Sequence, residues 1–420
     1  MDGPASTAAA SVRPGLPPLQ NPQFRWLLGS NFAFFMAIHG QSVVRSWLAF
    51  ELTGSNFALG QIAAAIAIPM LVIAPFGGVV ADRMERRRLI VVAQTVVLLS
   101  ELVLATLLFS DRLQFWHLLC GTTVMGMAFP LSMPARQALT VNVVGREALT
   151  SAMAISMGAM NLTRVIGPLV SGVMIDAIGV KGTYGMGAGL YFFALLSLVG
   201  VPRHQAAPPA GGRGSVLSEM AEGVRYLKGD RELRVLLLFG LLPMFLAMPT
   251  QQLMVVFAQE IWKVGSTGFG LLQGVAGVGG VAGAIWVARM GDGPRLRVML
   301  FAGLGFALLL GLFALSPWFV PALLLALLGY SLSAVYGTLN SSAIQLLTPD
   351  EVRGRITSFM MMSISLPLLG ALPVGALADR LGAPIAVASA CGLSALLVIV
   401  FWFSSPALRR LDQALLERRS

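Results

Sequence analysis

Twelve apolar runs, each of about twenty residues or more, follow one another along the chain. A hydrocarbon core about 30 Å thick is crossed by a helix of about 20 apolar residues, so each run is long enough for one span. Lipid offers no hydrogen bonds to the backbone, and a helix satisfies its own amides. We therefore expect an all-α membrane protein with about twelve transmembrane helices, over residues 25–50, 56–81, 88–110, 114–143, 150–177, 183–201, 234–259, 267–289, 297–315, 318–346, 356–378 and 384–404.

The composition excludes a soluble or a disordered chain. Of the 420 residues, 56% are hydrophobic and 11% are charged. Soluble domains carry about 25% charged residues, so this chain has under half of the usual water-facing groups. These groups cannot cover a soluble globule of this size, and so apolar a chain does not remain disordered. Lipid is therefore the expected solvent for most of the chain.

The basic residues predict how the chain is oriented. The net charge is +10, and most Lys and Arg residues lie at the ends of apolar runs, which favours the positive-inside rule over nucleic-acid binding. With the N-terminus inside, the inner segments carry 22 of them and the outer loops carry four. We therefore predict a multi-pass protein of the cytoplasmic membrane with both termini in the cytoplasm and no nucleic-acid partner. Three basic residues fall within runs: Arg45, Arg136 and Arg164.

No pattern typical of an enzyme or a metal site is present. The two cysteines, Cys120 and Cys391, lie inside apolar runs without a Cys/His cluster, so neither a disulfide framework nor a zinc site is supported. The chain has no Gly-x-Ser-x-Gly, no phosphate-binding Gly-x-x-x-x-Gly-Lys-Ser/Thr and no His-Glu-x-x-His. We expect no enzyme activity, no cofactor and no metal. The chain therefore also offers no site at which ATP could supply energy.

The runs fall into two groups of six, separated by a polar stretch. This stretch begins with Pro- and Gly-rich sequence and becomes charged from Glu219 to Arg234, which predicts a linker followed by a short surface helix. The first residues lack the apolar core of a signal peptide and are expected to form a flexible tail. The predicted units are a cytoplasmic tail (1–22), an N-terminal six-helix bundle (23–201), a cytoplasmic linker (202–233), a C-terminal six-helix bundle (234–404) and a second tail (405–420).

An internal repeat relates the two groups. The fifth run contains Gly172, Asp176 and Gly179, and the eleventh run contains the same residue types at an offset of 203, namely Gly375, Asp379 and Gly382. Two six-helix halves related by a parallel repeat are typical of transporters that rock around a midplane site. The alternative is that Gly-x-x-x-Asp at a helix end recurs by coincidence. The equivalent position in each half favours a true repeat.

A basic motif, Gly78-Val-Val-Ala-Asp82-Arg83-Met-Glu85-Arg86-Arg87-Arg88, follows the second run. An unpaired Asp82 carboxylate at the cytoplasmic membrane edge is costly, and the eleventh run begins near Ile356 on the same side. A helix N-terminus carries about half a positive charge, so contact between the Asp82 carboxylate and the start of the eleventh helix would join the two halves. The predicted conformational latch comprises Gly78, Asp82, Arg83, Arg86 and Arg87. Alternatively, the arginines only anchor a loop to anionic lipid.

These features resemble the major facilitator superfamily, whose loop signature between the second and third helices usually has glycine where this chain has Glu85. The resemblance covers residues 23–404 and implies two pseudo-symmetric six-helix bundles. Four further stretches resemble the enterobactin-exporter-like branch: Leu52–Ser55, Pro134–Ala138, Asn161–Pro168 and Pro349–Arg355. The fifth-helix motif, comprising Arg164, Gly167, Pro168 and Gly172, resembles in part that of the superfamily's antiporters. Pro168 is expected to kink its helix.

Polar residues inside the membrane are functional candidates by default. The resemblance implies that the first, fourth, seventh and tenth helices line the cavity. His39 suits either a proton relay or a packing role, and Arg45 either faces the cavity or extends to the outer surface. The candidates for binding substrate or protons on these helices are Asn31, His39, Gln41, Arg45, Arg136, Gln251, Gln252, Tyr330, Tyr336 and Asn340.

One more acid and one more base lie deep in the runs. Arg164 lies about 21 Å into the fifth span at 1.5 Å per residue, too deep for an easy escape to water, so it needs a partner. Glu101 is the only acid deep inside a run, and it is either that partner or a proton carrier.

We therefore expect a monomeric secondary active transporter that works by alternating access. Its partners are the lipid bilayer, protons as coupling ion and a small-molecule substrate, and the mostly apolar cavity lining suits a drug-like or siderophore-like amphipathic compound that is exported. The alternatives are an importer or facilitator of the same fold, and a non-transporting membrane sensor or assembly protein.

Overall fold

The computed structural model describes residues 17–145, 147–202, 225–226, 229–290, 295–348 and 365–404, without the side chains of residues 78, 79, 81–83, 232 and 295. Throughout these ranges the ordered elements are helices. Much of the predicted linker (202–233), residues 1–16 of the predicted tail 1–22 and the whole predicted tail 405–420 lie outside the described residues. The rest of the first tail holds the short helical turn Pro18–Gln20 and Pro22, the first residue of the first long helix.

The N-terminal half is one bundle of long helices. Its members are η1 (Pro18–Gln20), α1 (Pro22–Thr53), α2 (Asn56–Arg83), α3 (Arg86–Phe109), α4 (Phe115–Val144), α5 (Leu149–Ser197) and η2 (Leu198–Gly200). The bounds of α1 to α4 agree with the predicted runs within three residues. The fifth and sixth predicted runs form the single element α5, which is two helices that meet where Gly179 adopts a φ of 75°.

The C-terminal half repeats this arrangement. Its members are α7 (Arg231–Ala247), α8 (Thr250–Val256), the π-helical turn η3 (Phe257–Ile261), α9 (Gly265–Arg289), α10 (Arg295–Leu315), α11 (Phe319–Leu347), α13 (Ala371–Leu381) and α14 (Ala383–Ser404). The predicted run 234–259 is divided into α7, α8 and η3, although Leu233–Ile261 still forms one apolar span of 29 residues. Pro249 lies at the division, where a proline cannot donate a backbone hydrogen bond.

Ten described helical segments are long and apolar enough to cross a membrane. One of these segments, Leu149–Gly200, contains two of the predicted spans, which meet at Gly179. The predicted run 356–378 is described only in part, and α13 is the helix at its end. Large apolar side chains on the outside of the bundles are exposed, among them Val199, Phe301 and Phe403 at 69–71%. Apolar surface of this extent requires lipid around it. The structure thus confirms the predicted all-α membrane fold.

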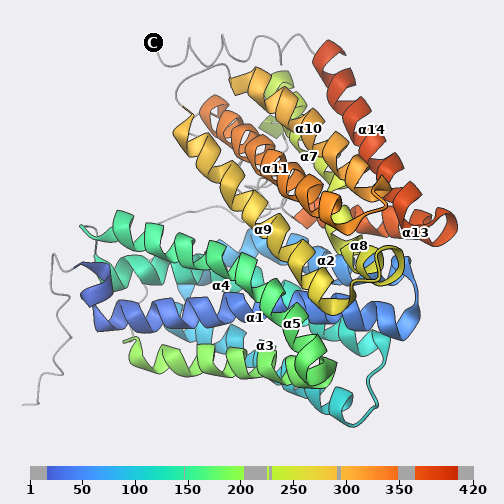
Figure 1. Ribbon diagram of the computed structural model, residues 1–420. Coiled ribbons are helices and arrows are strands. Elements are labelled where there is room, and N and C mark those ends of the chain that lie inside the picture. The colour runs from blue at the N-terminus through green and yellow to red at the C-terminus, as the bar shows by residue number, and fades with distance from the viewer. Residues whose placement is uncertain are drawn as a thin grey trace, which may run out of the picture.

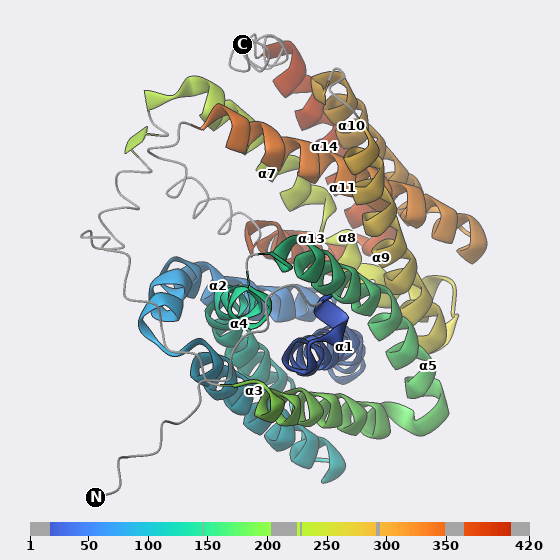
Figure 2. The same ribbon diagram turned by 90° about the vertical axis from the view of Figure 1, so that its left-hand side faces the viewer.

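The two halves approach each other at one end of the molecule. Figure 1 shows that α5 and α9 converge where α9 begins and diverge toward their other ends. Figure 2 shows α1 to α5 as one group of helices and α7 to α14 as the other. The contacts between the groups are made chiefly by α5 with α9 and by α2 with α13. The fifth helix of each half therefore packs against the second helix of the other half.

Glycine permits the close approach of α5 and α9. A Cβ atom at Gly172 would lie 2.6 Å from the backbone oxygen of Ser266, and one at Gly270 would lie 2.6 Å from that of Pro168. The equivalent seam has the same character, since a Cβ at Gly375 in α13 would lie 2.6 Å from the oxygen of Asn56 in α2. In lipid, van der Waals packing of small residues is a main source of helix association.

A valine at Gly270 is expected to force α9 away from α5 and to lower the melting temperature of the detergent-solubilised protein, because overpacking costs about 1–3 kcal/mol. Gly280→Val is the matched control, since a Cβ at Gly280 of the same helix has no atom within 4 Å. Differential scanning fluorimetry of the two variants measures the difference. Equal melting temperatures would show that the seam does not depend on glycine.

Candidate transport site

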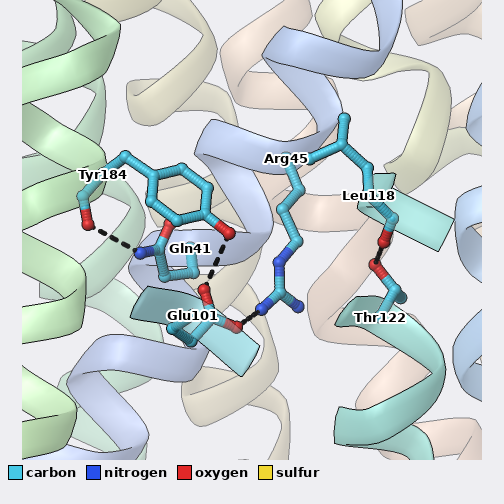
Figure 3. Close-up of polar contacts among 6 residues, drawn as sticks. All are labelled: Gln41, Arg45, Glu101, Leu118, Thr122 and Tyr184. Atoms are coloured by element: carbon cyan, nitrogen blue, oxygen red, sulfur yellow. Dashed lines mark hydrogen bonds and ion pairs between the residues drawn. The ribbon is translucent and has the colours of Figure 1, made fainter. Parts of the chain in front are cut away.

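A buried polar cluster joins three helices of the N-terminal half. Arg45 of α1 forms an ion pair with Glu101 of α3, and the two side chains are 6% and 1% exposed. The Tyr184 hydroxyl of α5 donates to the other carboxylate oxygen of Glu101 at 2.8 Å. Gln41 donates its side-chain amide to the Tyr184 carbonyl oxygen at 3.0 Å. Figure 3 shows the side chains of Arg45, Glu101 and Tyr184 pointing toward one another from α1, α3 and α5.

This cluster corrects two expectations. Glu101 pairs with Arg45 and not with Arg164, and Arg45 is turned into the bundle and does not extend to the outer surface. Arg45 and Glu101 each lie eight residues before the end of their helices, so at 1.5 Å per residue both are about 12 Å deep. Their equal depth explains the pairing. Both carboxylate oxygens of Glu101 are thus occupied, one by a cation and one by a hydroxyl, and this favours a structural role for the group.

Removing one member of this pair is expected to destabilise the protein strongly. Glu101→Gln leaves the Arg45 cation buried without its partner, which costs about 3–5 kcal/mol. The double variant Arg45→Met, Glu101→Leu removes both charges and is expected to regain most of the lost melting temperature in detergent. A Glu101→Gln protein that melts like the wild type, or a double variant that melts lower still, would contradict the structural role.

Arg136 of α4 is a second buried cation, 3% exposed. Its Nη1 donates to the side-chain oxygen of Asn31 in α1. Its guanidinium carbon lies 4.2 Å from the centre of the Phe34 ring. Its Nε and Nη2 have no hydrogen-bond partner in the part of the chain that the structure describes. This cation is therefore only partly satisfied by the protein.

Arg164 of α5 lies at the seam between the halves with an exposed side chain. It is within electrostatic reach of His39 in α1 and of Tyr330 in α11. A Cβ at Gly277 of α9 would lie 2.8 Å from the Arg164 backbone oxygen, and one at Gly167 would lie 3.0 Å from the His39 Cβ. Elements of both halves thus surround Arg164.

The rest of the fifth-helix motif forms the packed part of this seam. Gly167, Pro168 and Gly172 are buried. Pro168 lies within α5 between Gly167 and Gly172. The expected break at Pro168 is not found, because the backbone angles leave the helical range at Gly179 instead. The motif therefore brings α5 against α1 and α9 over its middle section.

The candidates in the C-terminal half differ in their surroundings. Gln251 and Gln273 exchange hydrogen bonds of 3.0 Å, and Gln252 is half-buried on the same helix. Tyr336 is fully buried and donates to the Phe239 carbonyl oxygen, which is a structural contact. Tyr330 is 4% exposed, and its hydroxyl lacks a partner among the described residues.

Asn340 lines a mostly apolar cavity of about 220 Å³ between α7, α11 and the segment before α13. Its side chain is 8% exposed, and its Oδ1 has no partner among the described residues. Met244, Met248 and Leu368 contribute to the apolar wall. A cavity of this kind accepts an apolar group that carries one hydrogen-bond donor.

The predicted conformational latch lies largely outside the described residues. This applies to the surroundings of Gly78, to the side chains of Asp82 and Arg83 and to the region around Ile356. Arg86 is described and donates to the Asn142 side chain at 2.6 Å and to the Ala138 oxygen at 3.3 Å. Arg87 donates to the Leu198 oxygen at 3.0 Å. These two arginines bind within the N-terminal half.

Two aspartates join the halves at the converging end, and we name their contacts the clasps. In the first clasp, Asp379 of α13 accepts from the backbone N–H groups of Asn56 at 2.6 Å and Phe57 at 3.2 Å, and from the Ser55 hydroxyl at 2.8 Å. Carboxylates are favourable at a helix N-terminus, where free N–H groups and the helix dipole meet them. Asp379 thus binds the start of α2 in the other half.

The second clasp is the equivalent contact of the first half. Asp176 of α5 accepts from the Thr267 N–H at 3.1 Å, from the Thr267 hydroxyl at 2.6 Å and from the Ser266 hydroxyl. The residue before α9, Val264, offers no side-chain cap, so Asp176 supplies the cap from the other half. Both aspartates are recognisable in the sequence from the offset of 203, but the sequence does not show which residues they contact.

Replacing both clasp aspartates by alanine is expected to widen the converging end. Spin labels at Leu52 and Leu381, which are 45% and 50% exposed and lie in different halves, report its width by pulsed electron resonance. The double variant Asp176→Ala, Asp379→Ala should give longer and broader distances. Asp111→Ala is the control, because its 2.7 Å ion pair with Lys181 stays within one half. An unchanged distance distribution in the double variant would contradict a holding role.

Comparison with known proteins identifies the relatives of this fold. A family model described as transmembrane secretion effector matches residues 13–419. The enterobactin exporter EntS of Escherichia coli O81 (strain ED1a) is 31% identical over 353 residues, which are 83% of each protein. The solved structure of the nucleoside transporter NupG has a TM-score of 0.74 at 13% identity and covers 91% of this chain and 98% of its own.

A bacterial homologue of the human lysosomal transporter Spinster, solved in an inward-facing and unoccupied conformation, has a TM-score of 0.67 at 13% identity and covers 96% of this chain and 99% of its own. Likeness to structures at such low identity shows the fold, whereas the family model and the exporter show the family. The relatives are transporters and not enzymes, and the chain is a multi-pass transporter of the inner membrane. It belongs to the transmembrane secretion effector family of the major facilitator superfamily.

Proposed function

We propose that this protein is a secondary active transporter that exports a small amphipathic compound across the cytoplasmic membrane in exchange for protons. Residues 23–201 and 234–404 would be the two moving bodies, connected by the linker 202–233. Both termini would lie in the cytoplasm, as the distribution of basic residues favours. A monomer is sufficient for this mechanism, since both halves belong to one chain.

The pair of clasps carries this proposal. Asp176 and Asp379 are exposed, and each binds the first turn of a helix in the other half. At a solvent-exposed surface, a broken hydrogen bond is replaced by hydrogen bonds to water, so each one contributes only about 0.5–1.5 kcal/mol to stability. The converging end can therefore open and close while each half keeps its own buried contacts, as alternating access requires.

Export is supported by the relative at 31% identity, whose name describes an enterobactin exporter. The cargo of that relative makes enterobactin a reasonable first probe for this chain. For the protons, His39 is the better candidate, because it lies half-buried at the seam beside Arg164. Glu101 is a poorer one, because Arg45 and Tyr184 already occupy its carboxylate.

Uptake into inside-out vesicles with an acidic lumen tests this function. Enterobactin is expected to accumulate in the lumen only while the pH gradient lasts, and a protonophore should abolish the accumulation. His39→Gln is expected to reduce gradient-driven uptake at least tenfold but to leave downhill exchange in place. Equal uptake with and without a gradient would indicate a facilitator. A complete absence of uptake would favour a non-transporting role.

A further inference from the structure

The charges inside the described membrane segments do not balance. Glu101 is the only buried acid among the described residues, and it is paired with Arg45. Asp176 and Asp379 are exposed and bind helix starts at the clasps. Neither Arg136 nor Arg164 forms an ion pair with any described residue. Within the described part of the chain, two positive charges are therefore left without a carboxylate.

The unused atoms of Arg136 have a specific geometry. Its Nη1 is occupied by Asn31, whereas Nε and Nη2 have no partner in the described structure. In a guanidinium group, the Nε–H and Nη2–H bonds point in parallel along one edge. This edge forms two parallel hydrogen bonds to a carboxylate or phosphate, the strongest contact that arginine makes. The buried edge is thus shaped for the two oxygens of an anion.

The two cations lie at different depths on one side of the seam. Arg136 is eight residues before the end of α4, and Arg164 is fifteen residues after the start of α5. The short connection between these helices puts both ends at the same face, so the cations are about 12 Å and about 22 Å from it. Along α5, Asp176 lies 27 residues from Leu149, or about 40 Å from that face.

Of the two cations, Arg136 therefore lies nearer to this face, and Arg164 lies near the middle of the membrane. The clasp carboxylates lie at the far end, where they do not neutralise either cation. A buried arginine without a counter-charge costs several kcal/mol, roughly, when no ligand is bound. A ligand that supplies the missing oxyanion recovers that energy, whereas a neutral or cationic ligand does not.

We propose that the cargo is an amphipathic anion, and that the side-on edge of Arg136 binds its oxyanion before Arg164 receives it at the seam. This inference rests on the proposed transport function and names the chemical class of its substrate. Carboxylate, phosphate and ionised phenol groups share the required chemistry. The apolar part of the cargo remains in the largely apolar surroundings of the spans.

Equilibrium binding to the full chain in lipid nanodiscs tests the proposal with matched probes. 1-Naphthoate and 1-naphthamide have the same ring and nearly the same shape, but only the first is an anion. Titration calorimetry is expected to show naphthoate binding at least tenfold more tightly. Equal affinities, tighter binding of the amide, or no binding of either probe up to its solubility limit would overturn the proposal.

Substitutions of Arg136 and Arg164 test whether these two cations cause the preference for naphthoate over naphthamide. Arg136→Gln is expected to reduce the preference for naphthoate at least fivefold, whereas Arg136→Lys keeps the charge and part of the preference. Arg164→Gln, whose exposed side chain makes no hydrogen bond to a described residue, should fold normally and weaken naphthoate binding separately. Arg112→Gln removes an exposed loop cation as the control. A preference that survives in the double variant Arg136→Gln, Arg164→Gln would also overturn the proposal.

These measurements need no gradient, so they are independent of transport. Gradient-driven export without any preference for anions would reject only the anionic cargo. Selective naphthoate binding without transport of any compound would reject only the transport function.

Discussion

Lipid provides no hydrogen-bonding partner, and this constraint determines the role of each polar group inside the spans. The protein satisfies some of them largely, although the Nε of Arg45 has no hydrogen-bond partner among the described residues. Arg45, Glu101 and Tyr184 bind one another, and Tyr336 donates to a backbone oxygen. Arg136 is equally buried, but two of its nitrogens, Nε and Nη2, have no hydrogen-bond partner in the described part of the chain. This difference favours a structural role for the first groups, and it is the basis on which Arg136 is proposed as a contact for a ligand.

The fold was largely predictable because its physical cause is visible in the sequence. A run of about twenty apolar residues has one stable conformation in a bilayer, and the predicted bounds of α1 to α4 agree with the structure. Local backbone breaks were less predictable. Gly179 divides α5, and the seventh run is divided at Pro249, although apolar composition continues through both places.

Partners across helices were harder to predict, because a sequence gives depth but not rotation about the helix axis. From the sequence, Glu101 was considered as a partner for Arg164 only, although Arg45 and Glu101 lie at equal depth from the ends of their helices and form the actual pair. The repeat located Asp176 and Asp379 correctly as equivalent residues. Their partners depend on how the halves pack, and the uncapped start of α9 at Val264 was the one readable signal.

The placement of these contacts explains why the clasps and not the buried pair are suited to move. Breaking the Arg45–Glu101 pair would leave a charge in a dry interior, at a cost of about 3–5 kcal/mol. Opening a clasp exposes a carboxylate and a helix start to water, which satisfies both. The glycines behind the clasps keep the helices in contact without interlocking large side chains. In the proposed transport cycle, a seam built in this way would separate at an energy within reach of a bound ligand or proton, while the bundles on either side stay intact.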